Sequence, residues 1–199
     1  MIPPAEWTLS DAARLLREPQ HRLIYLCEKS VVVPEFGNAK GRGSSRRFST
    51  RNILEFALAL KLRELTLPVH TVAAIIHVLR ALETKVAGEI QGFDLVGGLR
   101  TKNAPDLRII ISDGRRLYFS LGTATATPRI FGGLDFRSLA GMKLKPGTRR
   151  KDKFSVRDFG MGASVEPTST AEFGGPECSR HTRIEISVTR IAKDLPLGE

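Results

Sequence analysis

The order of elements in the N-terminal part of the chain constrains the fold more than any other feature of the sequence. A short helix is predicted over Ser10–Leu16, where Thr8 or Ser10 can accept hydrogen bonds from the free amide groups. A second short helix is predicted near Gln20–Lys29, after a turn that contains Pro19. Two short helices joined by a tight turn form a helix-turn-helix, whose second helix normally enters the major groove of DNA.

A basic, glycine-rich loop follows this pair of helices. Strands are predicted over Val31–Val33 and Arg46–Phe48, with the loop Gly37–Ser45 between them. Glycine lets a hairpin tip adopt positive φ and lets the backbone approach a phosphate closely. The pattern is typical of the wing of a winged helix-turn-helix, and a surface loop without fixed structure remains the alternative.

Two amphipathic helices are predicted to complete this unit. Ser49 or Thr50 can cap the first, which runs to Leu67, and Pro68 separates it from the second. The apolar stripe of the second helix predicts domain core, and its far end could extend into a dimer contact. Gly88 is expected to end it. Four residues of the helix near Gln20–Lys29 are predicted to face the core: Leu23, Ile24, Leu26 and Cys27.

The composition changes after this helix, and residues 92–144 are predicted to form short strands and turns. Leu107–Ile111 and Arg116–Leu121 flank an Asp-Gly pair, which suits the type I′ turn of a β-hairpin. Phe131–Leu139 is predicted to form another short element. Arg183–Ile191 alternates apolar and polar residues and is predicted to be a last strand.

Two further segments of the C-terminal half differ in composition. Lys143–Arg157 is a basic run, interpreted as a solvated loop or as a binding segment for nucleic acid or an acidic partner. Phe159–Pro176 is rich in Gly, Ser and Thr, which predicts a mobile linker near residues 159–176.

The formal net charge of +10 favours a partner that carries phosphates, because binding releases condensed counterions, although a merely basic surface would give the same sum. Cys27 and Cys178 lie far apart without metal-ligand spacing, so reduced thiols and no metal site are expected. His21 and His181 lie in separate elements, and His70 and His77 are seven residues apart on one helix with no carboxylate or cysteine nearby in sequence, so neither catalysis nor a cofactor is expected. No signal peptide or membrane-spanning run is predicted, which favours a cytoplasmic, nucleoid-associated protein.

Four segments within residues 7–82 resemble the DNA-binding domain of the MerR family of bacterial transcription regulators: Trp7–Leu15, Arg22–Glu28, Arg46–Ser49 and Leu62–Pro68. The resemblance implies a winged helix-turn-helix that binds a pseudo-palindromic operator as a homodimer and distorts promoter DNA. The cysteines that metal-sensing members carry near the dimer helix have no counterpart here, so metal sensing is not expected.

The candidate DNA-binding residues divide by expected role. Arg22 is expected to contact a guanine edge or a phosphate, since a bidentate arginine–guanine pair discriminates strongly between bases. Gln20 and His21 could contact adenine edges or phosphates, and Tyr25 could pack on a sugar–phosphate unit. The remaining basic residues are expected to hold the DNA backbone: Arg14, Lys40, Arg42, Arg46, Arg47 and Arg51.

The sequence therefore predicts an α+β protein with a winged helix-turn-helix over residues 5–88. A small β-rich domain over residues 89–199, for an effector or for oligomerisation, is predicted to follow. The predicted function is sequence-specific binding of double-stranded promoter DNA by a transcriptional regulator. The alternative is an interaction adaptor, or an antitoxin-like or phage-type DNA-binding protein, whose β-rich domain binds a partner protein.

Overall fold

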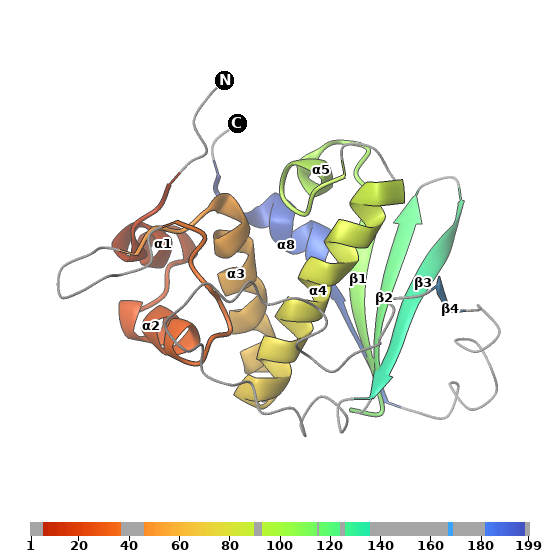
Figure 1. Ribbon diagram of the computed structural model, residues 1–199, viewed down its shortest axis with the longest axis horizontal. Coiled ribbons are helices and arrows are strands. Elements are labelled where there is room, and N and C mark those ends of the chain that lie inside the picture. Colours follow the sequence, from red (N-terminus) through yellow and green to blue (C-terminus); the bar gives the residue numbers. More distant parts are fainter. Residues whose placement is uncertain are drawn as a thin grey trace. The chain divides into compact units, whose positions relative to one another are not determined.

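The computed structural model describes residues 6–36, 46–89, 93–114, 116–123, 126–135, 167–168 and 182–197. The chain combines helices with an antiparallel sheet, which confirms the α+β class (Figure 1). The helices are α1 (Leu9–Leu16), α2 (Gln20–Glu28), α3 (Thr50–Glu64), α4 (Val69–Glu89), α5 (Gly97–Arg100) and α8 (Val188–Asp194). The strands are β1 (Asp106–Ser112), β2 (Arg116–Thr123), β3 (Ala126–Asp135), β4 (Pro167–Thr168) and β5 (Arg183–Ser187).

The chain divides into two compact units. The first runs to Ile76 and also contains the chain from Ile191 onward, and the second extends from His77 to Arg190. The sequence placed the boundary at residues 88 and 89, which is the end of α4, whereas the two units divide inside this helix.

In the first unit, α1, α2 and α3 contact one another, and side chains define where α1 and α3 begin. The Thr8 hydroxyl accepts from the backbone amide of Asp11 at 3.1 Å, and the Asp11 carboxylate accepts from the backbone amide of Thr8 at 3.1 Å. Ser49 caps α3 in the same manner, with Asn52 as its partner. Such reciprocal pairs satisfy amide groups that the helix leaves free. No side chain caps α2, which follows Pro19.

The strand predicted over Val31–Val33 does not form. Ser30 has a φ of 54°, and the amide of Val31 donates to the carbonyl oxygen of Leu26 at 2.9 Å, so the chain turns back onto the end of α2. Val31 and Val32 are fully buried. Their β-branched side chains therefore fill the core without joining a sheet.

The ends of α3 and α4 differ slightly from the prediction. α3 ends at Glu64 rather than at Leu67, because Thr66 adopts a φ of 60°. α4 continues to Glu89, so Gly88 lies in its last turn. Nearly every residue of the first half of α4 is buried, as expected for its apolar stripe.

The second unit contains an antiparallel sheet with the strand order β4-β3-β2-β1-β5 (Figure 1). The predicted hairpin is confirmed, since β1 pairs with β2, and Asp113 and Gly114 have φ angles of 56° and 59°. Such positive values are what a type I′ turn requires. β3 covers the described part of the element predicted over Phe131–Leu139. The basic run Lys143–Arg157 lies outside the described residues, as does most of 159–176.

The last predicted strand is shorter than expected, because the chain turns into α8 after Ser187. The Ser187 hydroxyl accepts from the amide of Arg190 at 3.1 Å and so caps the helix. Thr189 is tied to the chain before β1: its hydroxyl donates to Pro105 O and accepts from Leu107 N, both at 2.8 Å. These side-chain bonds end the strand, although the hydropathy alternation continues to Ile191.

Residues on the two faces of the sheet alternate as the register requires. Ile110, Tyr118 and Ile130 form a buried cluster on one face. Arg108 and Glu185 lie on the same face, and the guanidinium donates to the carboxylate at 3.1 Å. Hydrogen bonds to Asp106 and then to Glu185 raise the pKa of Arg108. These exposed charges join β1 to β5 and are expected to contribute little to stability.

Candidate nucleic-acid interface

A buried asparagine fixes the chain on both sides of the basic loop. Asn52 is fully buried, and its side chain makes four hydrogen bonds, one of which belongs to the capping box of α3. Its Oδ1 accepts from the amides of Glu35 at 3.0 Å and Ser49 at 3.2 Å, and its Nδ2 donates to Val33 O at 3.0 Å and Glu55 Oε2 at 2.9 Å. An amide group with all its bonding capacity used fixes the position of the segments it joins. The chain before the loop is thereby attached to α3.

The two ends of the loop form the base of a hairpin. Phe36 and Arg47 exchange backbone hydrogen bonds of 3.3 and 3.1 Å, and Trp7 and Phe48 exchange two of 2.9 Å. Three extended segments therefore lie side by side at single bridges, which is less strand than the sequence predicted over Arg46–Phe48. The Phe48 ring packs on Phe56 at 5.2 Å and anchors this base in the core. Lys40 and Arg42 lie outside the described residues.

The surface of α2 that points away from the core carries the predicted contact residues. Leu23 and Leu26 are buried, whereas Gln20, His21 and Arg22 are exposed. Tyr25 is exposed as well, which agrees with its predicted placement. The sequence assigned Ile24 to the core, and this is wrong: its side chain is 37% exposed. Successive helical residues are about 100° apart, so a core stripe through Leu23 and Leu26 does not include Ile24.

Several predicted arginines form ion pairs near the surface. Arg14 pairs with Asp11 at 2.8 Å, and Arg22 pairs with Glu18 at 2.6 Å. Arg51 pairs with Glu35 at 3.2 Å. Exposed pairs of this kind are weak, so their guanidinium groups can exchange a carboxylate for a phosphate at little cost.

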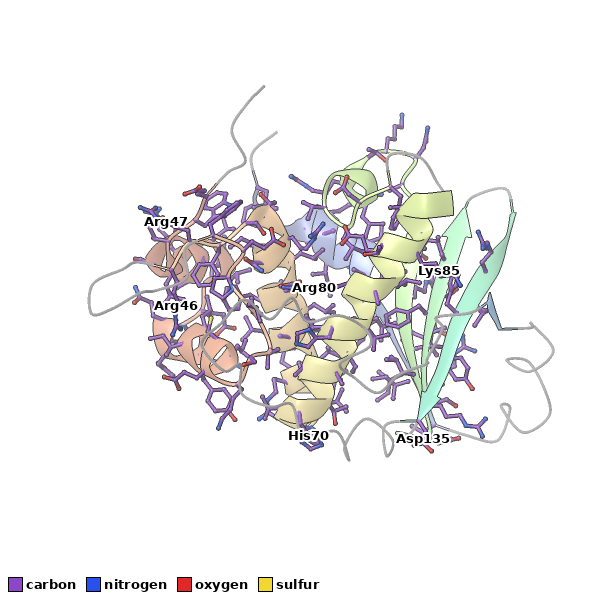
Figure 2. All side chains as sticks on the ribbon, viewed as in Figure 1. Arg46, Arg47, His70, Arg80, Lys85 and Asp135 are labelled. Atoms are coloured by element: carbon purple, nitrogen blue, oxygen red, sulfur yellow. The ribbon has the colours of Figure 1, made fainter. Side chains whose placement is uncertain are left out.

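Asp11 connects α1 electrostatically to the hairpin base. Hydrogen bonds from Thr8 lower the pKa of the Asp11 carboxyl, and the charges of Arg14 and Arg47 lower it further. Arg47 is half-buried, and in Figure 2 it lies beside α1. Two predicted phosphate-binding residues from different elements therefore flank a single carboxylate.

Arg46 connects the hairpin base to α2. Burial raises the pKa of the Cys27 thiol to about 11, and the nearby Arg46 guanidinium opposes this rise through its charge and a hydrogen bond. The exposed Arg46 therefore lies next to the C-terminal half of α2, and Figure 2 shows it beside this helix.

The sequence analysis missed two cations at this surface, Arg17 and Lys29, and one apolar residue, Ile24. Arg17 ends α1 with a φ of 55° and is exposed in the turn before α2. The Lys29 ammonium lies 5.7 Å from the centre of the Tyr25 ring, one helical turn away. This spacing could have been recognised, since residues four apart share a helix face.

These residues come from α1 and the turn after it, from α2 and the residue that ends it, from the hairpin base and from the first turn of α3. We call this set the α2–hairpin surface; its members are Arg14, Arg17, Gln20, His21, Arg22, Ile24, Tyr25, Lys29, Arg46, Arg47 and Arg51. Seven of them carry a permanent positive charge, and four carboxylates lie beside them: Asp11, Glu18, Glu28 and Glu35. The surface is therefore net positive and suits a polyanion that presents both phosphates and apolar groups.

The comparisons with known proteins add no relative. No family model matches this chain, and no curated protein matches it. In the described part of the chain, no three or more His, Cys, Asp and Glu side chains are grouped so that they could hold a metal ion. The helices described there are also too short or too polar to cross a membrane.

Proposed function

We propose that this protein is a sequence-specific transcriptional regulator of the MerR type, which binds double-stranded promoter DNA through a winged helix-turn-helix. In this proposal α2 enters the major groove, and the hairpin that starts at Phe36 and Arg47 acts as the wing. A homodimer in the bacterial cytoplasm binds a pseudo-palindromic operator. The second unit serves effector binding or oligomerisation, and no catalytic step is assigned to it.

The observation that carries the proposal is the exposed face of α2 with cations on both sides. Arg22 and Lys29 lie on one side of this helix, and Arg46 lies beside Cys27 on the other. A helix that reads base edges needs flanking cations, because contacts to phosphates set its depth and register in the groove. The shortness of α2 also fits, since a recognition helix uses its N-terminal residues for base contacts.

The roles of the individual residues follow from their positions. Gln20, His21 and Arg22 occupy the first turn of α2 and are proposed to reach base edges or phosphates. Arg14, Arg46, Arg47 and Arg51 are proposed to hold the backbone, together with Arg17. Lys40 and Arg42 belong to the proposed wing by their place in the sequence.

Selection of bound duplexes from a random pool tests the proposal. We expect the full chain to enrich a pseudo-palindromic site, and Arg22→Ala to bind with a loss of about 1–3 kcal/mol of base discrimination at one position of each half-site. Lys61→Ala is the matched control, because Lys61 forms a similar exposed pair with Glu64 at 2.7 Å outside the α2–hairpin surface. A pool that shows no enrichment would refute the proposal.

A further inference from the structure

Two large apolar side chains are exposed on the helix that we propose to enter DNA. Ile24 is 37% exposed and Tyr25 is 41% exposed, both on α2, and Leu65 at the end of α3 is 37% exposed. Ile24 is aliphatic and Tyr25 is aromatic, and together they form an exposed apolar site among polar and charged residues, which suits a contact made in a complex.

Ile24 occupies a definite place within this surface. It lies four residues after Gln20 and three before Cys27, so all three are on one flank of α2. The same flank faces the hairpin base, because Arg46 lies next to the Cys27 thiol. Ile24 therefore provides an apolar contact between a polar residue that can bind a base and a cation that can bind the adjoining phosphate.

The charge around Ile24 selects its partner. Arg22, Lys29 and Arg46 are exposed on this surface together with Glu28, which lies one helical turn after Ile24, and Arg22 pairs with Glu18. The cations outnumber these acids, so a second copy of the same surface would bring net positive charge against net positive charge, which like-charge repulsion opposes. Duplex DNA brings phosphates to these cations. It also presents one exposed apolar group in the major groove, the C5-methyl of thymine.

We propose that Ile24 contacts the C5-methyl group of a thymine in each half-site and so determines a preference for thymine at that position. This inference rests on the proposed function. Gln20 and Arg46 flank the contact and fix its register. Tyr25, whose ring carries the Lys29 ammonium at 5.7 Å, lies farther round the helix and faces the sugar–phosphate backbone.

Uracil substitution isolates the methyl group. In a selected duplex, each thymine is replaced in turn by deoxyuridine, which keeps the base pairing and removes only the methyl. We expect one position in each half-site at which the wild-type chain binds about fourfold more weakly, as for one buried methyl group. Ile24→Ala should bind the thymine duplex and the deoxyuridine duplex equally well. Leu65→Ala should still bind the deoxyuridine duplex about fourfold more weakly than the thymine duplex.

The outcomes separate the two proposals. The Ile24 assignment is wrong, and the DNA-binding function stands, if wild type binds duplexes specifically but binds the thymine and deoxyuridine duplexes equally well. The same conclusion follows if Ile24→Ala keeps the fourfold difference in affinity between these duplexes. If Ile24→Ala instead changes the mass of the free protein in solution and leaves uracil sensitivity intact, Ile24 is a contact between protein chains and the assignment is wrong. If no duplex is bound, both the proposed function and the Ile24 assignment are wrong.

Discussion

The side-chain amide of Asn52 donates to the carbonyl oxygen of Val33 at 3.0 Å and so attaches α3 to the chain that leads into the basic loop. The other amide contacts of Asn52 reach Glu35 on one side of the loop and Ser49 on the other. One buried residue thus holds both ends of the proposed wing in register with the helices.

Replacing this residue should be costly. Asn52→Ala leaves the buried amide of Ser49 and the carbonyl of Val33 without this partner, and we expect a loss of about 3 kcal/mol in the free energy of unfolding. Urea denaturation followed by circular dichroism measures it. Asn103→Ala, at an exposed position in the second unit, should be neutral. A loss below about 1 kcal/mol for Asn52→Ala would contradict the role given to this network.

The capping box of α1 makes a second prediction. Thr8→Ala removes the hydroxyl that caps the helix and should cost about 1 kcal/mol of stability. Ser10→Ala, at the neighbouring exposed position inside the helix, should have little effect. Equal losses in the two variants would show that Ser10, the alternative cap considered from the sequence, contributes as much as Thr8.

The capping carboxylate should make stability depend on pH. The pKa of Asp11 is lower in the folded protein than its ordinary value of 3.8, mainly through hydrogen bonds with Thr8. The stabilisation by ionised Asp11 is therefore complete above this ordinary value and is lost as the pH falls through the lowered pKa. Asp11→Asn should show a shallower loss of stability on acidification than wild type. Glu6→Gln, at an exposed site, should follow the wild-type curve.

The thiol of Cys27 should react slowly. With its pKa raised to about 11 by burial, the thiolate fraction near pH 8 is about 100-fold below that of an ordinary cysteine. Iodoacetamide labelling, quantified at the Cys27 peptide by mass spectrometry, should be slow in the folded protein and ordinary in urea. Arg46→Ala should slow it further, because Arg46 favours the thiolate. Faster labelling in that variant would mean that Arg46 shields the thiol rather than activating it.

The fold was predictable where local chemistry determines structure. The Asp-Gly turn between β1 and β2 and the start of α4 directly after Pro68 are local signals, and both were predicted correctly, whereas α3 ends three residues earlier than predicted. Helix ends were less accessible to prediction. α1, α2 and α3 are followed by Arg17, Ser30 and Thr66 in the left-handed conformation, where glycine would have given a signal in the sequence. Val31–Val33 has strand composition but is used as core.

The candidate site also contains residues whose placement could be predicted from local sequence and residues whose placement depends on tertiary contacts. The exposure of His21 follows from helical periodicity once Leu23 and Leu26 are placed inside. Gln20 and Arg22 are three and four residues before Leu23 and Leu26, respectively, so periodicity places them beside the core stripe, and their exposure comes from the structure. Ile24 was assigned to the core because hydropathy was given more weight than its angle around the helix. The proximity of Arg46 to Cys27 could not be foreseen, because it depends on how the hairpin base bridges to Trp7 and on the buried Asn52.

The salt dependence of DNA binding by the full chain tests the central proposal most directly. A dimer that places four cations of each subunit on phosphates should give a slope of log affinity against log salt of roughly −7. Arg46→Ala should reduce this slope by about two across the dimer and weaken all duplexes alike. Lys61→Ala should leave it unchanged. A slope near zero, or the same slope for wild type and Arg46→Ala, would contradict DNA binding through the α2–hairpin surface.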